Sequence, residues 1–277
     1  MNRFALAASI IFAILASGCA TFSVSDEQLL SELEGAPVPT RIRYTEVDDW
    51  TIRSLESGDP SQPQVVLIHG APGSLDAFSG YFKIERLVER VHLVSADRPG
   101  YGESDHGRIE TSIERQAELL RPLIRRGAIL VGHSYGGTTA LRIAMDYPEL
   151  VGGLVIVAGS LSPEHERIFF FNRPMEWPVF NWMMSRSWKV ANAEKVTRIA
   201  ELERMLPLWP RVTAPTVLFH GTNDSLVPYP HSVFADSQLV NAETRLLTLE
   251  GESHFILWSE QERIVDAILS LIRTQTP

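Results

Sequence analysis

Cysteine is almost absent from this chain: Cys19 is the one cysteine among its 277 residues. This excludes an internal disulfide and any metal site that needs several cysteines. A clustered basic segment is also lacking, because the 25 lysines and arginines are spread along a chain of net charge −9. Nucleic-acid-binding surfaces need such a cluster, so we expect no nucleic-acid partner. Internal repeats are missing too, and the length suits one large α/β domain.

The apolar run at the amino terminus is too short to cross a bilayer comfortably, which takes about 20 residues. It covers residues 4–16, follows the positively charged Arg3 and is succeeded by small residues at 17–18. This order is typical of an export signal. We therefore predict a signal peptide over residues 1–18.

The end of that segment, Leu-Ala-Ser-Gly-Cys at residues 15–19, resembles the lipobox of bacterial lipoproteins. In that family the signal is cleaved before the cysteine, and the new amino terminus carries lipid. The resemblance implies lipid attachment at Cys19, which accounts for a lone thiol in an exported protein. It implies a membrane partner and a location at the bacterial cell envelope, on the outer membrane or the periplasmic face. The alternative is a plain secretory signal beside an incidental cysteine.

Residues 19–40 are predicted to be a tether between this anchor and a domain over residues 41–277. Within the tether, Ser25 is expected to cap a short helix by pairing with Gln28. Prolines at positions 37 and 39 then end any helix.

Apolar segments typical of buried strands alternate with helical segments through the domain. Strands are expected at 42–47, 51–57, 65–68, 91–96, 128–131, 153–158, 215–220 and 245–249, and helices at 112–126, 138–145, 193–205 and near the carboxyl terminus. This alternation predicts an α/β fold with a parallel sheet covered by helices on both faces.

The alternation breaks at about 160–210, where we predict a small helical cap. Its segment Phe169–Trp188 holds four of the twelve phenylalanines and three of the six tryptophans. These side chains are expected partly to line a substrate pocket and partly to form the core of the cap.

Gly-His-Ser-Tyr-Gly at 132–136 lies between a predicted strand and a predicted helix. In this context Gly-x-Ser-x-Gly is the pattern of a nucleophile elbow, a strained turn that exposes a serine at the carboxyl end of a sheet. Ser134 is the predicted nucleophile. A serine hydroxyl needs a base and an acid that orients the base, and these follow in the order acid, then histidine.

Asp224 and His254 are the predicted acid and base, because each follows a predicted strand downstream of Ser134. Two further downstream histidines, His165 and His231, are less suited, since one lies in the cap and the other in the segment after Asp224. Glu250 and Glu252 lie too close in sequence to His254 to act as the usual acid. His92 opens a strand at the opposite edge of the sheet.

Two backbone amides are expected to bind the oxyanion that forms during acyl transfer. Tyr135, directly after the nucleophile, supplies one of them. Ala71, in the loop His69-Gly70-Ala71-Pro72-Gly73, supplies the other, since Pro72 has no N–H. His69 is interpreted as a scaffold residue that bonds the loop backbone, and Asp97, Arg98 and His133 as structural.

Together, the segments at 69–73, 97–104, 132–137, 220–224 and 251–255 resemble an α/β-hydrolase of the fold-1 type. The resemblance covers roughly residues 41–275. It implies an eight-stranded, mostly parallel sheet, a cap inserted after the sixth strand, and no cofactor or metal.

We expect a serine hydrolase that cleaves a carboxylic ester of a small or medium apolar acyl group through an acyl-enzyme. Serine at the elbow disfavours dehalogenases and epoxide hydrolases, which carry aspartate there. An amidase, aminopeptidase or lactonase of the same fold remains an alternative, as does a non-catalytic envelope protein that binds a small molecule.

Overall fold

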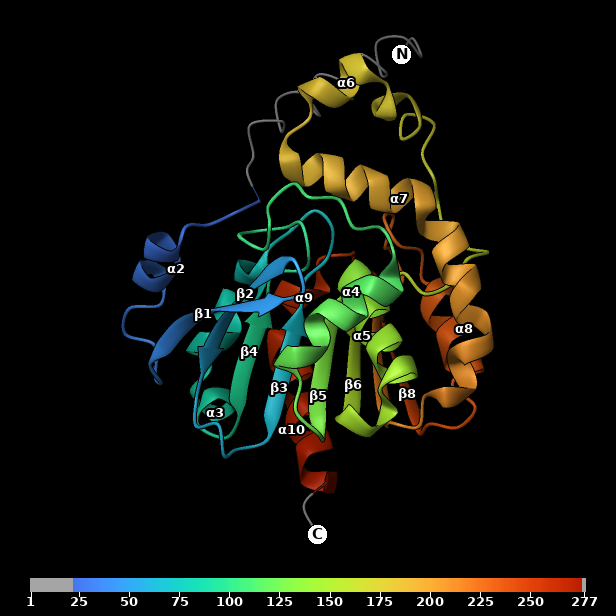
Figure 1. Cartoon of the computed structure of the whole chain (residues 1–277). Coiled ribbons are helices and arrows are strands. Elements are labelled where there is room, and N and C mark those ends of the chain that lie inside the picture. The colour runs from blue at the N-terminus through green and yellow to red at the C-terminus, as the bar shows by residue number, and fades with distance from the viewer. Residues whose placement is uncertain (1–21, 276–277) are drawn as a thin grey trace.

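The computed structural model describes residues 22–275 and contains one eight-stranded sheet. Its order is β1-β2-β4-β3-β5-β6-β7-β8 (Figure 1). The strands are β1 (Thr40–Val47), β2 (Trp50–Ser57), β3 (Gln64–Ile68), β4 (His92–Ala96), β5 (Ala128–His133), β6 (Val151–Val157), β7 (Thr216–Gly221) and β8 (Thr244–Leu249). Strand β2 pairs antiparallel with both of its neighbours, β1 and β4. The six strands β3 to β8 all run parallel to one another. The predicted eight-stranded, mostly parallel sheet is thereby confirmed.

Helices cover both faces of this sheet. One face carries α4 (Ile113–Leu120), η2 (Arg121–Leu123), α5 (Tyr135–Asp146), η5 (Leu206–Arg211) and α8 (Pro230–Gln238). The other carries α2 (Asp26–Glu32), η1 (Leu75–Lys83), α3 (Glu85–Val88), α9 (Ile256–Ser259) and α10 (Gln261–Gln275). A short turn, η3 (Pro148–Leu150), leads into β6.

The central strands are buried on both sides, which explains their continuous apolar sequences. In β3, Val66 and Ile68 contribute to the core on the α5 side, and Val65 and Leu67 to the core on the α10 side. Because successive strand side chains point to opposite faces, one apolar run supplies both cores.

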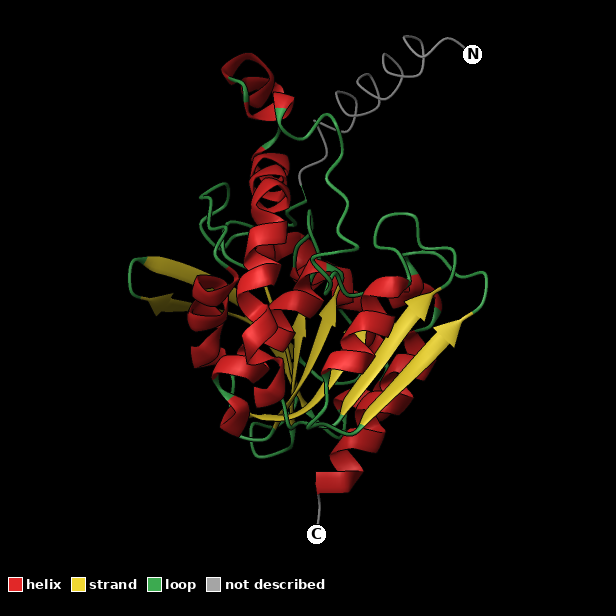
Figure 2. Ribbon diagram, turned by 90° about the vertical axis from the view of Figure 1, so that its right-hand side faces the viewer, coloured by secondary structure: helices red, strands yellow, loops and turns green. Residues whose placement is uncertain are grey.

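The insertion between β6 and β7 forms a cap of η4 (Pro174–Glu176), α6 (Pro178–Met183) and α7 (Arg186–Met205), closed by η5. Figure 2 shows the parallel strands pointing toward this cap, with α6 farthest from the sheet. Helix α7 begins seven residues before the predicted start at Ala193. The prediction was wrong there because much of the inward face of α7 is polar, with Glu194 and Arg198 buried, so apolar periodicity is weak.

Another correction concerns the helix predicted over 112–126. Helix α4 begins after Ser112, whose hydroxyl accepts a hydrogen bond from the Arg115 amide, but it ends at Leu120. The chain continues as the 3-10 turn η2, because Pro122 lacks the amide that an α-helix needs.

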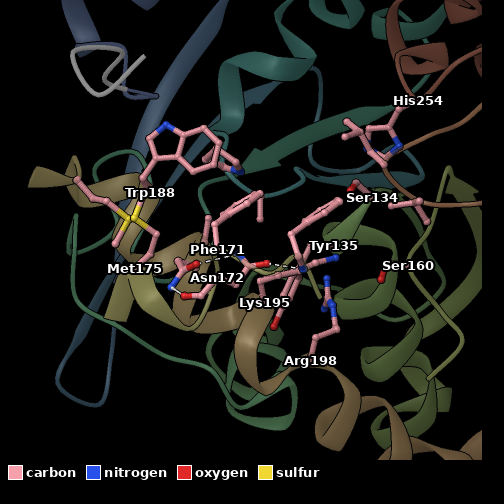
Figure 3. Close-up of a pocket in the computed structure, with 18 residues that line it drawn as sticks. Ser134, Tyr135, Ser160, Phe171, Asn172, Met175, Trp188, Lys195, Arg198 and His254 are labelled. Carbon is pink, nitrogen blue, oxygen red and sulfur yellow. Dashed lines mark hydrogen bonds between the residues drawn. The ribbon is translucent and has the colours of Figure 1, made fainter. Parts of the chain in front are cut away.

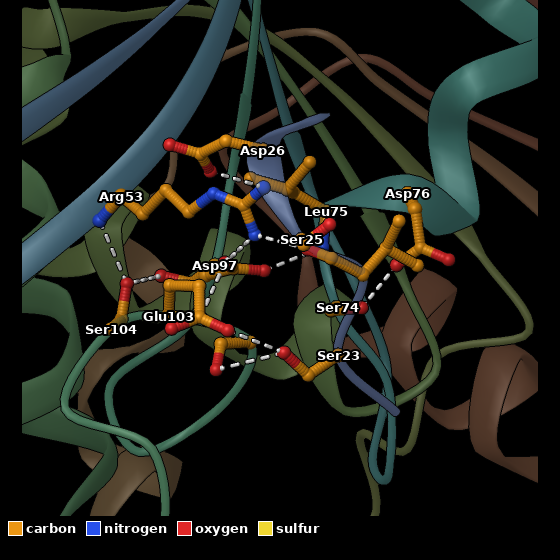
Figure 4. A network of polar contacts seen from close by, with 12 residues as sticks. Ser23, Ser25, Asp26, Arg53, Ser74, Leu75, Asp76, Asp97, Glu103 and Ser104 are labelled. Carbon is orange, nitrogen blue, oxygen red and sulfur yellow. Dashed lines mark hydrogen bonds and ion pairs between the residues drawn. The ribbon is translucent and has the colours of Figure 1, made fainter. Parts of the chain in front are cut away.

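The segment predicted as a tether packs on the domain over its described part. Ser25 and Gln28 form the expected reciprocal cap of α2, but Leu29 and Leu33 are buried in the core rather than free. Figure 4 shows how polar contacts add to this: the buried Arg53 donates to the Val24 carbonyl and pairs with Asp26. The folded unit therefore includes residues that the sequence assigned to the tether.

The predicted signal peptide and Cys19 lie outside the described residues. Within residues 22–275, no helix combines the length and apolar character needed to span a membrane.

Candidate active site

Ser134 lies on a strained turn between β5 and α5. Its backbone has φ 54° and ψ −118°, a conformation that residues other than glycine rarely adopt. The flanking glycines are required by close packing: a Cβ on Gly132 would lie 2.4 Å from the Gly136 carbonyl oxygen, and one on Gly136 would lie 2.1 Å from the Ile68 carbonyl oxygen. The elbow predicted from the sequence is therefore present.

His254 and Asp224 are brought together from the loops after β8 and β7. His254 Nδ1 lies 2.6 Å from Asp224 Oδ2, and both side chains are almost fully buried. A carboxylate at this distance keeps the imidazole proton on Nδ1, which leaves Nε2 free to accept a proton.

The second oxygen of Asp224 is held by the backbone. Oδ1 accepts hydrogen bonds from the amides of Leu226 and Val227, at 2.9 and 2.8 Å. Burial alone would raise the pKa of Asp224, but hydrogen bonds from His220 and His254 outweigh burial and hold that pKa well below its usual value. Asp224 is thus an ionised acceptor in a fixed orientation.

His220 is a residue whose place at the site the sequence did not reveal. It is fully buried, and its Nε2 lies 2.8 Å from the Val227 carbonyl and 3.4 Å from Asp224 Oδ2. Its Nδ1 lies 2.6 Å from Ser232 Oγ. His220 therefore helps to orient the loop that carries Asp224, and its position within a strand gave no signal of this.

Ser134 and His254 line the same cavity, which has a volume of about 370 Å³. Figure 3 shows them close together on one side of it. In the part of the chain that the structure describes, the Ser134 hydroxyl makes no hydrogen bond to the imidazole. Such contacts are often long in unliganded sites and shorten when substrate binds.

Ala71 and Tyr135, the predicted oxyanion donors, also line this cavity. Tyr135 is the first residue of α5, so its amide has no acceptor within the helix. The loop of Ala71 packs against the elbow, since a Cβ on Gly70 would lie 3.0 Å from Ser134 Cβ. Both candidate donors therefore come from segments beside Ser134.

The histidines interpreted as scaffold make the backbone contacts expected of that role. His69 Nδ1 lies 2.7 Å from the Gly70 carbonyl, and its Nε2 accepts a hydrogen bond from the Arg98 amide at 2.9 Å. His133 Nε2 lies 3.2 Å from the carbonyl of His254, and burial lowers the pKa of His133 to about 3. Each is held neutral, and His133 supports the backbone of the candidate base.

The aromatic segment of the cap forms the far wall of the cavity, as predicted. Phe169, Phe171, Met175, Met184 and Trp188 line it.

Polar residues of the cap also line the cavity, and the sequence did not reveal them. Lys195 and Arg198 of α7 are among the lining residues. Both contact Glu166: Lys195 forms an ion pair with Glu166, and Arg198 Nε lies 3.9 Å from Glu166 Oε2. The sole signal available was the spacing of charged residues along α7, which normally indicates a solvated face. Within residues 22–275, no group of histidine, cysteine and acidic side chains is arranged to hold a metal ion.

Comparison with known proteins identifies relatives over most of the chain. The model of the alpha/beta hydrolase family matches residues 65–267. A Haemophilus influenzae protein whose name proposes an esterase/lipase is 26% identical over 245 residues, which cover 74% of this chain and 82% of that protein.

Solved structures share the fold at low identity. A candidate lipase from Acinetobacter baumannii superposes with a TM-score of 0.71 and 20% identity, covering 92% of this chain and 98% of that one. A bacterial membrane phospholipase A gives a TM-score of 0.65 and 24% identity, with 99% of each chain covered. The family match runs from β3 to α10 and includes the strained Ser134 turn, and the sheet order agrees with it, so this chain belongs to the alpha/beta hydrolase family.

Proposed function

We propose that this protein is a serine hydrolase that cleaves carboxylic esters with a small or medium apolar acyl group. One observation carries the proposal: Ser134, on its strained turn, opens into the same cavity as His254, whose Nδ1 is held by Asp224 at 2.6 Å. This is the constellation that nucleophilic acyl transfer needs.

In the proposed reaction, Ser134 Oγ attacks the ester carbonyl while His254 Nε2 takes the hydroxyl proton. The amides of Ala71 and Tyr135 stabilise the negative charge on the carbonyl oxygen. The tetrahedral intermediate collapses as His254 returns the proton to the leaving alcohol. His254 then takes a proton from water, whose oxygen attacks the acyl-enzyme, and returns it to Ser134 Oγ when the acid is released. Asp224 orients the imidazole throughout and stabilises its charged form.

An apolar acyl group is favoured by the walls of the cavity. Phe169, Phe171 and Met175 offer hydrocarbon and aromatic surface to a chain bound beside Ser134. The names of the Haemophilus and Acinetobacter relatives, an esterase/lipase and a lipase candidate, agree with ester chemistry.

Labelling by a fluorophosphonate probe tests the nucleophile. We expect the folded wild type to be labelled and the Ser134→Ala variant to be inert in both labelling and ester turnover, with little change in melting temperature. Ser162→Ala is the matched control: Ser162 also lies beside a histidine, 2.9 Å from His165 Nδ1, but it does not line the cavity. Labelling should persist in that variant.

A panel of p-nitrophenyl esters and aminoacyl amides tests the substrate class. Faster turnover of the amides would replace the esterase proposal by an amidase or aminopeptidase, and preferred turnover of lactones would indicate a lactonase. Absence of labelling in folded wild-type protein would favour a non-catalytic binding protein.

We further propose that the mature chain is anchored to the bacterial envelope through lipid on Cys19. Phe22, three residues further on, packs edge-on against Trp188 of the cap with ring centroids 6.2 Å apart. Three extended residues reach about 11 Å. The same cap also carries exposed aromatic side chains: Trp182 is 81% exposed and Phe170 78%. Aromatic side chains of this kind suit the interface of a bilayer.

A further inference from the structure

The cavity beside Ser134 contains a buried cation that lacks hydrogen-bond partners. Arg198 is 4% exposed and lines the cavity, yet its Nε and Nη1 make no hydrogen bond to any described residue. Its guanidinium carbon lies 3.3 Å from the centroid of the Tyr135 ring, the residue directly after the nucleophile. Buried charged groups are normally hydrogen-bonded, so an exception in a cavity calls for a partner.

The other polar side chains that line the cavity are mostly satisfied within the protein. Asn172 and Asn192 bond each other, with Asn172 Nδ2 2.9 Å from Asn192 Oδ1. Ser160 and Lys195 both contact Glu166. The indole N–H of Trp188 is unpartnered, like Arg198. The unpaired groups of Arg198 and Trp188 are donors, so they suit a ligand rich in acceptor oxygens.

The balance of charge points the same way. Lys195 and Arg198 share one carboxylate, Glu166, between them. Although burial acts to raise the pKa of Glu166, the charges of Arg198 and Lys195 hold it below its usual value, so Glu166 is ionised. A second buried pair, Arg98 with Glu194, neutralises itself at 2.8 Å. On the cap side of the cavity, these two cations and one carboxylate therefore leave one positive charge in excess.

We propose that the substrate carries an oxyanion, a carboxylate or a phosphate, that binds Arg198 with support from Lys195. A planar guanidinium recognises such groups through paired, charge-assisted hydrogen bonds. The aromatic wall then takes the hydrocarbon part of the molecule, and the anion holds one end while the ester lies at Ser134. This assignment rests on the proposed esterase function for the role of the site, but anion binding can be measured without turnover.

Binding is tested first by thermal denaturation of the full chain with adipate or inorganic phosphate. We expect one of the two anions to raise the melting temperature of the wild type by at least about 2 °C at saturation. Arg198→Met should lose this shift, and Arg198→Lys should keep part of it. The matched control is Arg173→Met, an exposed cap arginine outside the cavity lining, which should retain the full shift. The anion that stabilises the wild type identifies the class.

Specificity is tested with pairs of esters that differ in charge but not in shape. On the acyl side, p-nitrophenyl hydrogen adipate is compared with p-nitrophenyl 6-methylheptanoate. On the alcohol side, 3-carboxy-4-nitrophenyl butanoate is compared with 3-isopropyl-4-nitrophenyl butanoate. We expect kcat/KM to favour the anionic member of at least one pair, and Arg198→Met to reduce that preference by about tenfold or more.

The two proposals fail in different ways. If neither anion stabilises the wild type and neutral esters are preferred in both pairs, the anion site is wrong while the esterase stands. If anions stabilise the wild type but no ester is turned over and Ser134 resists labelling, the esterase is wrong and the anion site stands. Should Arg198→Met fail to fold, the wild-type measurements alone still decide whether the cavity binds an anion.

Discussion

At the scale of single residues, the partners of a histidine decide what it can do. His254 is held at Nδ1 by an ionised carboxylate, so its Nε2 can take and return a proton. His69 uses both nitrogens on backbone groups. His231 Nδ1 accepts hydrogen bonds from the amides of Leu161 and Ser162, both at 3.0 Å, and so fixes the start of the cap. The His231 ring also hydrogen-bonds the backbone of His165, so of the three only His254 keeps a nitrogen free for chemistry.

Because His231 is buried, we predict that the protein loses stability as the pH falls. Burial lowers the pKa of His231 to about 4, whereas an unfolded histidine titrates near 6.5. Between these values the unfolded chain binds a proton that the folded chain does not, so this contribution to stability is complete above pH ~6.5 and is lost as the pH falls toward ~4. The free energy of unfolding should therefore fall by about 1.4 kcal/mol per pH unit from this group.

Urea unfolding of the wild type and of His231→Asn between pH 7 and 4.5 measures this change in unfolding free energy with pH. Asparagine can place an acceptor oxygen near the position of Nδ1 but does not titrate in this range. The slope of unfolding free energy against pH should decrease by the contribution of one proton. An unchanged slope would mean that His231 already titrates normally in the folded protein.

At the scale of elements, the helix assigned to the tether closes one face of the sheet. Leu29 is fully buried in the core on the α10 side of the sheet, whereas its neighbour Leu30 is 40% exposed. Helix α2 has only seven residues and is too short to be stable alone. Its position therefore depends on this packing and on the contacts of Arg53.

The pair Leu29 and Leu30 gives a matched test of that packing. Leu29→Ala should lower the free energy of unfolding by about 2–5 kcal/mol, because it removes buried methyl groups and leaves a cavity. Leu30→Ala, one residue along the same helix, should change it by less than about 0.5 kcal/mol. Chemical denaturation measures both. Equal, small effects would show that residues 22–39 act as a free tether after all.

At the scale of the whole molecule, the proposed lipid anchor would hold the cap side of the domain toward a membrane, because Phe22 packs on Trp188. A Cys19→Ala precursor is expected not to partition with membranes, since the residue that would carry the lipid is removed. Fractionation of cells that express the variant checks this, with Ser134→Ala as a control that keeps the anchor. Envelope association of Cys19→Ala would contradict the lipid-anchor proposal.

The sequence was informative wherever a local pattern has a single structural meaning. Continuous apolar runs marked the buried strands, and glycines around Ser134 marked the elbow, because larger side chains cannot fit there. The order of Ser134, Asp224 and His254 predicted three residues that now lie around one cavity or in contact with its lining. The end of α4 was missed because Pro122 converts its last turn to a 3-10 turn, and the start of α7 was missed because its polar inward face weakens the apolar periodicity.

Sequence alone was enough for the fold class and for the candidate nucleophile, acid and base, because backbone strain and strand order impose strict local requirements. The positions of α2 and His220, and the placement of Lys195 and Arg198 at the cavity, depend on the folded chain. Arg198 and Glu166 are 32 residues apart in sequence and look like ordinary surface charges there. Their meaning comes from burial, since removal from water turns a charge without a full set of partners into a binding group.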